Sequence, residues 1–177
     1  MKTAAIYGGA IAFANAFVTL LLFFFGFHNN PDRMLMGMLL GLVAVVTITA
    51  IGLVLGIRAI RAEKGPGKFS YGQAFIAGLL VAVFCSVFGT AFQVAYIKAV
   101  NPRYTESMEQ WAQGMMEKGN MPSGEIEERL EEMRAKSGIG YQVRNGLLFG
   151  LAFGTVTSLI AAAFLRRNPD SADAPAA

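Results

Sequence analysis

Five glutamates fall within eight positions of SGEIEERLEEMRAKSG, the segment at residues 123–138. Clustered carboxylates can act as acid–base catalysts or bind a cation, so this segment is the first candidate for chemistry. The acids surround a narrow apolar stripe, Ile126, Leu130 and Met133, at the spacing of one helix face. A solvated helix face has no pocket that would shift a carboxyl pKa, and the segment lacks the alternating acids and central glycine of an EF-hand loop. The pattern therefore favours a solvent-facing helix surface over an acidic site.

Two pairs in this segment have the spacing of ion pairs within a helix. Glu125 stands four residues before Arg129, and Glu132 stands four before Lys136. An acid placed four residues before a base is the favourable order on a helix. Both pairs support the same interpretation, a helix whose charged side chains face water.

The sulfur and imidazole side chains form no recognisable metal site in the sequence. Cys85 is the only cysteine and His28 the only histidine, and they lie in different parts of the chain. Methionine sulfur suits copper(I), but the methionines near the glutamates are irregularly spaced. These are Met108, Met115, Met116, Met121 and Met133. Nucleophile-elbow, metalloprotease and phosphate-loop motifs are also missing, so we expect neither an enzyme nor a cofactor or metal site.

Long charge-free runs separate the polar segments and indicate where the protein lies. The chain has 177 residues, of which 15% are charged, and its mean hydropathy is +0.47. Residues 6–27, 34–57, 74–97 and 146–165 contain no Asp, Glu, Lys, Arg or His. An α-helix of about 20 apolar residues crosses the hydrocarbon core of a bilayer. The runs therefore predict four membrane-spanning helices.

The predicted fold class is all-α, an integral membrane four-helix bundle with an amphipathic extracytoplasmic helical hairpin between spans three and four. Small residues recur at every fourth position in spans one, three and four, as at Gly146, Gly150 and Gly154. Such stripes let helix backbones approach closely, so we expect a compact bundle. The expected segments are spans one to three within residues 1–97, the hairpin at 98–144, span four at 145–165 and a disordered cytoplasmic tail at 166–177.

Basic residues predict the side of the membrane on which each connection lies. Those that abut the spans are Lys2, then Arg58, Arg61, Lys64 and Lys68 between spans two and three, and Arg166 and Arg167 after span four. Connections rich in Lys and Arg remain in the cytoplasm. Residues 98–144 also hold seven basic residues, but eight glutamates accompany them over a longer stretch. The density of basic residues therefore predicts that both termini are cytoplasmic and that the hairpin is external.

Two apolar stripes mark the helices of the predicted hairpin. Asn101 and Pro102 indicate the start of the first helix, and Ser123 is positioned to cap the second. Neither helix can bury its stripe alone, so the stripes pair with each other, rest on the outer leaflet, or dock on the bundle or a partner. The hypothesised contact residues are Tyr104, Met108, Trp111, Met115, Ile126, Leu130 and Met133.

Each span also carries a small polar side chain near its midpoint. These residues are Asn15, Thr47, Ser86 and Thr155. Interhelical hydrogen bonds contribute about 0.6 kcal/mol each in membrane bundles, which is the structural interpretation. The functional interpretation is a hydrated path for a small solute or ion. No ionisable residue accompanies the cluster, so a proton-coupled path has no visible carrier, and the structural interpretation is favoured.

Three stretches of the sequence resemble a known family. They are GIRAIRAEKGPGKFSYG with its continuation FSYGQAFIAGLL, YIKAVNPRYTE, and MMEKGNMPSGEIEERLEEM. The chain is similar over nearly its whole length to an uncharacterised family of bacterial inner-membrane proteins, classed as a domain of unknown function. The resemblance implies four spans, a long connection before the last span and a location in the bacterial inner membrane. It implies no activity and no catalytic residues.

Two functions of different classes follow from these observations. The first is a non-enzymatic membrane protein that binds a partner protein, membrane lipid or a second copy of itself through the external hairpin. The alternative is a small-solute or ion transporter or channel that uses the midplane polar residues. A membrane enzyme acting on lipid lacks a nucleophile–base pair or metal set. The net charge of +3 is small and comes from residues that flank the spans, so we expect no nucleic-acid binding.

Overall fold

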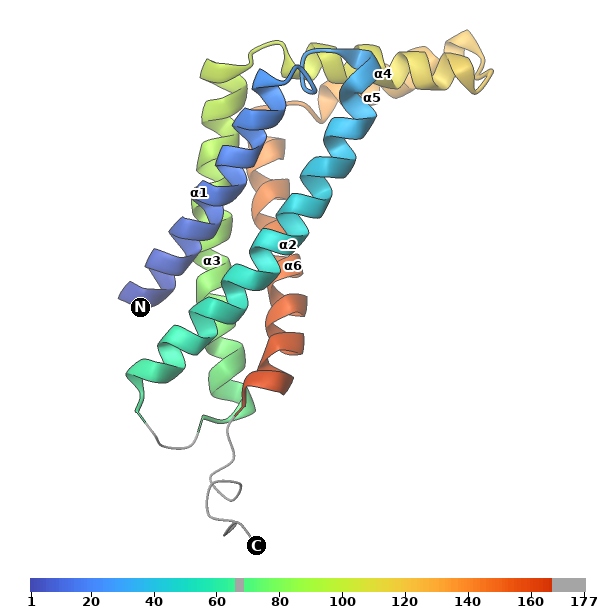
Figure 1. Cartoon of the computed structure of the whole chain (residues 1–177). Coiled ribbons are helices and arrows are strands. Elements are labelled where there is room, and N and C mark those ends of the chain that lie inside the picture. Colours follow the sequence, from blue (N-terminus) through green and yellow to red (C-terminus); the bar gives the residue numbers. More distant parts are fainter. Residues whose placement is uncertain (66–68, 167–177) are drawn as a thin grey trace, which may run out of the picture.

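The computed structural model describes residues 1–65 and 69–166, and these residues form six α-helices and one short π-helix. The elements are α1 (Lys2–Phe24), α2 (Pro31–Glu63), α3 (Tyr71–Ala95), η1 (Tyr96–Val100), α4 (Tyr104–Lys118), α5 (Ser123–Ala135) and α6 (Ile139–Leu165). Helices α1, α2, α3 and α6 form a bundle, and α4 and α5 lie across one end of it (Figure 1). The predicted all-α fold is confirmed. Apart from Arg166, the predicted tail lies outside the described residues, as does Lys68.

The bundle exposes large apolar side chains and buries small ones. Four helices are long and apolar enough to cross a membrane, namely Lys2–Phe24, Pro31–Glu63, Tyr71–Val100 and Ile139–Leu165. The outward-facing rings of Phe13, Phe149 and Phe164 are 75%, 76% and 83% exposed. A soluble protein rarely exposes so much contiguous apolar surface, whereas hydrocarbon solvates it without cost. The fold is therefore that of a membrane helical bundle.

Helix α3 is the centre of the bundle because α1 and α6 both pack closely against it. Gly8 of α1 lies directly over the α3 backbone, and Gly154 and Gly150 of α6 lie over Ala82 and Ser86. A side chain at any of these glycines would collide with α3. The small residues found in the sequence therefore lie in two seams, one between α1 and α3 and one between α3 and α6.

Polar contacts join the helix ends opposite α4 and α5. The Arg61 guanidinium donates to the carbonyl oxygen of Leu165 at 3.1 Å, where it also meets the negative end of the α6 dipole. The Thr3 hydroxyl donates to the Glu63 carboxylate. Phe69 is buried just before α3, with the Lys64 ammonium 5.7 Å from its ring centroid. These contacts hold α1, α2 and α6 in register at that end.

Three helix starts differ from the expected ones. Helix α4 begins at Tyr104 because the Asn101 side chain bonds the Tyr96 hydroxyl instead of capping a helix. Pro122 precedes α5, which begins at Ser123, and the Ser123 hydroxyl caps nothing. Helix α6 begins at Ile139, within the segment assigned to the hairpin. Its first turns therefore extend beyond the apolar run that begins at Gly146.

We expect Gly8→Ala to destabilise the bundle and Gly9→Ala to leave its stability unchanged or slightly higher. A Cβ at Gly8 would lie 2.8 Å from two backbone atoms of α3, the nitrogen of Cys85 and the oxygen of Val81. A Cβ at Gly9 would meet only the Phe88 ring, at 3.7 Å. Overpacking against a backbone costs about 1–3 kcal/mol because a backbone cannot move aside as a side chain can.

Thermal unfolding of both variants in the same detergent measures this difference. A lower Tm for Gly8→Ala alone is the expected result. Equal Tm values would contradict the close α1–α3 seam.

Candidate functional site

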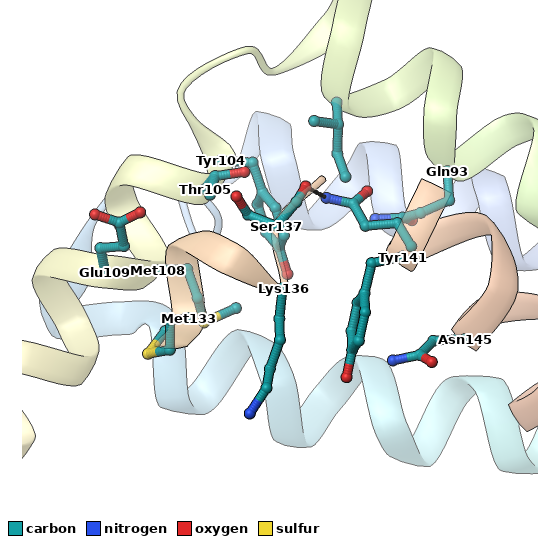
Figure 2. A pocket seen from close by; sticks show the side chains of 12 residues that line it. Gln93, Tyr104, Thr105, Met108, Glu109, Met133, Lys136, Ser137, Tyr141 and Asn145 are labelled. Carbon is teal, nitrogen blue, oxygen red and sulfur yellow. Dashed lines mark hydrogen bonds between the residues drawn. The ribbon is translucent and has the colours of Figure 1, made fainter. Parts of the chain in front are cut away.

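A cavity of about 420 Å³ lies at the end of the bundle, between the end of α3, helices α4 and α5, and the start of α6. We name it the end cavity (Figure 2). Its apolar wall comes from Ile97, Met108 and Met133. Its polar wall comes from Gln93, Tyr104, Thr105, Glu109, Lys136, Ser137, Tyr141, Gln142 and Asn145. The end cavity is therefore amphipathic, with one cation and one carboxylate among its lining groups.

The polar wall is organised by the junction between α5 and α6. The Gln142 side-chain amide donates to the carbonyl oxygen of Ser137 at 2.7 Å, which fixes the turn before α6. Lys136, before this turn, and Tyr141, after it, extend in the same direction, and Asn145 lies near the phenol end of Tyr141 (Figure 2). An ammonium, a phenol and an amide thus lie along one side of the cavity. These are hydrogen-bond donors suited to an anionic oxygen.

The two charged groups of the end cavity differ in how firmly they are paired. Glu109 accepts a hydrogen bond from the Arg134 guanidinium at 3.0 Å, and its side chain is only 21% exposed. Lys136 lies 3.2 Å from Glu132, but both side chains are more than half exposed. An exposed pair of this kind contributes little. The Lys136 ammonium is therefore the charge available to a ligand.

The hypothesised contact residues of the hairpin lie in three environments. Tyr104, Met108 and Met133 line the end cavity. Ile126 and Leu130 are each 8% exposed, buried along α5. Of the others, Trp111 is half-buried and Met115 is 46% exposed. Most residues of the apolar stripes are therefore buried along α5 or line the end cavity, and few lie on an open outer surface.

The glutamate cluster faces solvent, as its spacing indicates. Its five members are exposed on α5. Glu132 forms the expected contact with Lys136, and the described residues contain no ion pair between Glu125 and Arg129.

A second cavity of about 450 Å³ lies inside the bundle, between α1, α2, α3 and α6. We name it the bundle chamber. Of the predicted midplane residues, Asn15 and Ser86 line it, whereas Thr47 and Thr155 do not. The Asn15 amide donates to the Thr49 hydroxyl at 3.3 Å, and Thr47 is exposed on α2. Side chains two positions apart on an α-helix point about 200° away from each other. Only one of Thr47 and Thr49 can therefore face the bundle.

A family model described as "Protein of unknown function (DUF4199)" matches residues 5–167. The match covers the four spans of the bundle together with α4 and α5. The chain belongs to this family. The predicted membership in a family of unknown function is thereby confirmed. No curated protein and no solved structure matches the chain.

The sequence did not single out several residues that form the two cavities of this DUF4199 chain. The sequence indicated only an ion pair for Lys136. It placed Tyr141 and Gln142 in the connection before span four and Asn145 at the start of the span-four segment. Their spacing at the start of α6 places them on one helix face, which is a weak signal. Gln93 lines both the end cavity and the bundle chamber. That shared position depends on how α3 and α6 pack, which no local pattern indicates.

A buried polar cluster adjoins the end cavity of the DUF4199 chain. His28 Nδ1 lies 2.7 Å from the Tyr96 hydroxyl, which also accepts a hydrogen bond from the Asn101 amide at 3.3 Å. The Tyr104 ring packs on His28, with centroids 5.3 Å apart. Because the phenol oxygen has two lone pairs, the Tyr96 hydroxyl can accept from Asn101 and still either donate to His28 Nδ1 or accept from it. The cluster joins the α1–α2 turn to the end of the third span.

We expect the stability of the wild-type protein to fall as the pH drops below 6.5, the ordinary histidine pKa. Burial lowers the pKa of His28 in the folded protein. The unfolded chain therefore binds the proton more readily, and each step downward in pH through this window favours unfolding. The rings of Tyr96 and Tyr104 that pack on His28 carry no charge in this range.

The measurement is the Tm in detergent over this pH range, for the wild type and for His28→Gln. The variant cannot titrate at this position, so its Tm should change less steeply with pH, whatever its absolute value. Parallel curves for the two proteins would show that His28 is not the group responsible.

Proposed function

We propose that this chain is a non-enzymatic, multi-pass membrane protein that binds phospholipid in its end cavity. The supporting observation is the composition of that cavity, in which the Lys136 ammonium, Tyr141 and Asn145 stand beside an apolar wall of Ile97, Met108 and Met133. A phospholipid head group joins an anionic phosphate to apolar chains. A cavity with one cationic, donor-rich wall and one apolar wall is complementary to both parts.

The position of the end cavity supports the same proposal. It lies where the third span ends and α6 begins, at the level where the apolar helices leave the hydrocarbon core. Helices α4 and α5 run across the bundle end, roughly perpendicular to the spans and past its edge (Figure 1). An amphipathic helix in this orientation lies along the membrane interface. Head groups of the adjacent leaflet therefore reach the cavity without leaving the bilayer.

The proposed topology places both termini in the cytoplasm of a bacterium and the end cavity on the external face of its inner membrane. Lys2 begins α1, and Arg58, Arg61 and Lys64 lie in or just after the last turns of α2. These two helix ends point away from α4 and α5 (Figure 1). Dense basic residues next to the spans favour the cytoplasmic side.

A partner protein or a second copy of the chain is the alternative to lipid as the bound molecule. Trp111 and Met115 are the members of the apolar stripes that stay accessible away from the end cavity. Lipid is preferred because the end cavity combines several hydrogen-bond donors with an apolar wall, whereas these two side chains line no such cavity.

We expect Lys136→Gln to reduce retention of phospholipid about tenfold, because a hydrogen bond to a charged group contributes about 1.5 kcal/mol. Lys118→Gln is the matched control, since Lys118 ends α4 and does not line the end cavity. The two variants have the same composition and net charge.

Native mass spectrometry of the full chain, released from detergent micelles, counts the phospholipids bound to each variant. Retention that is lost in Lys136→Gln and kept in Lys118→Gln supports the proposal. Equal retention in both would contradict a head-group site at Lys136.

One observation favours a second candidate, a transport path through the bundle chamber. The buried side-chain oxygen of Asn15 has no hydrogen-bond partner within the described residues. An unpaired buried amide oxygen costs about 1–3 kcal/mol unless water or a polar solute satisfies it. A path for a small polar solute would provide that donor, and Thr49, Ser86, Thr90 and Gln93 would continue it.

Cys85 is the only cysteine and lines the bundle chamber, so it can test this candidate without any substitution. If the chamber is a water-filled path, Cys85 in intact membranes should react with a charged, water-soluble thiol reagent. Resistance in intact membranes, with full labelling after denaturation, would eliminate the transport candidate. A Cys85→Ser, Ser137→Cys variant is the positive control because Ser137 lines the end cavity.

A further inference from the structure

We propose that the bundle chamber holds one acyl chain of the phospholipid whose head group occupies the end cavity. The inference rests on the proposed function, to which it adds a binding site for the acyl chain of the same phospholipid. It makes the two cavities one site for an amphiphile, polar at the end of the bundle and apolar within the membrane.

The lining of the two cavities is continuous along α3. Gln93 belongs to both, with Ile97 beyond it in the end cavity and Thr90, Ser86 and Ala82 below it in the bundle chamber. These residues follow one another at three- and four-residue intervals. They therefore lie on one face of α3, which carries the groove from the bundle end into the membrane.

Helix α6 continues the same groove. Asn145 lines the end cavity, and the next residue, Gly146, lines the bundle chamber, followed by Phe149, Phe153 and Gly154. From Tyr141 in the end cavity to Gly154, the helix rises about 20 Å at 1.5 Å per residue. One leaflet of a bilayer contributes about 15 Å of hydrocarbon. The combined groove is therefore long enough for an acyl chain that spans its leaflet.

The bundle chamber opens toward the side of the bundle. Leu42 of α2 and Phe149 of α6 both line it, yet they are 61% and 76% exposed on the outer surface. In a membrane this surface meets lipid tails. A tail can therefore enter between α2 and α6 from the bilayer. The same opening would place a water-filled path in contact with hydrocarbon, which favours the acyl chain as occupant.

Two hydrogen bonds within the protein involve polar side chains that line the chamber. The Ser86 hydroxyl donates to the carbonyl oxygen of Ala82 at 2.8 Å, and the Asn15 amide donates to Thr49. The Ser86 hydroxyl and the Asn15 amide nitrogen therefore need no hydrogen bond from the ligand, and the Asn15 oxygen is the buried chamber atom without a partner among the described residues. The surface that remains for the ligand is predominantly apolar, as an acyl chain requires.

Charge complementarity orients the ligand. Among the described residues, Lys136 is the cation that lines the end cavity, and none of those that line the bundle chamber is charged. The phosphate therefore belongs at Lys136, and the apolar chain is directed along α3 and α6 into the membrane.

The test uses the full chain reconstituted in bilayers that contain phosphatidylethanolamine with a photoreactive diazirine at the far end of one acyl chain. A second probe carries the diazirine beside the carboxyl group of the same chain. Mass spectrometry of the crosslinked peptides gives the attachment sites. We expect the far-end probe to attach to residues 82–90 and 146–154, and the near probe to attach around Gln93 and Tyr141.

Gly89→Leu provides a variant that fills the chamber without disturbing the seams. Gly89 lines the bundle chamber, and a Cβ there would meet no atom within 4 Å. Gly72→Leu is the matched control, because Gly72 also has open space, lies on α3 and does not line the chamber. We expect Gly89→Leu to reduce crosslinking of the far-end probe about tenfold, since excluding roughly two methylenes costs about 1.6 kcal/mol. Gly72→Leu should crosslink at the wild-type level.

Three other outcomes overturn the inference. If the far-end probe attaches only to outward residues such as Phe13 and Phe164 while Lys136→Gln still loses lipid, the head-group site stands and the acyl-chain site fails. If Lys136→Gln retains lipid normally and both probes attach outside the two cavities, the proposed function fails as well. If Leu42 and Phe149 crosslink to a second copy of the chain, the groove is a subunit interface.

Discussion

The bundle depends on close contact between helix backbones, because a membrane removes the driving force that buries large apolar side chains in water. Lipid tails solvate phenylalanine and leucine as well as a protein core does, so their outward position costs nothing. Association is then left to dispersion contacts and hydrogen bonds, which strengthen when backbones approach. Gly8 on one side of α3 and Gly150 and Gly154 on the other permit that approach. Helix α3 consequently becomes the element on which the other spans are arranged.

The same constraint explains why the bundle contains a cavity. Helix α2 approaches its neighbours at Gly52, which faces Ile11, and at Gly56, which faces Tyr7 and Val81. Its earlier turns carry larger side chains, including Leu42 and Val45, and these line the bundle chamber instead of closing it. Helix α2 also crosses the bundle obliquely (Figure 1). Helix α2 is also closely packed near its start, where Gly37 faces Phe27. The chamber therefore lies between two close contacts of α2, beside its larger side chains.

Predictions from sequence succeeded where a long stretch is dominated by residues of one kind, apolar or small. The four apolar runs, the absence of charge within them and the small-residue stripes each predict a span or a seam independently of its neighbours, and the structure contains those elements. Helix starts were less predictable because Asn101 has several competing partners. It satisfies the Tyr96 hydroxyl, a partner five residues earlier, in place of a cap on the following helix. The choice depends on the position of His28, which comes from another part of the chain.

The sequence alone determined the membrane location, the spans and the solvent-facing nature of the glutamate cluster, because hydropathy and helix periodicity act over a few turns of one helix. Only the tertiary structure decided which polar residues meet. It brings Asn15 and Ser86 to one chamber and leaves Thr47 outside, because the rotation of α2 about its axis is set by contacts with other helices. It likewise brings Lys136 and Tyr141 together with Gln93 across three helices. Such convergence arises from packing between distant segments, which local sequence patterns do not encode.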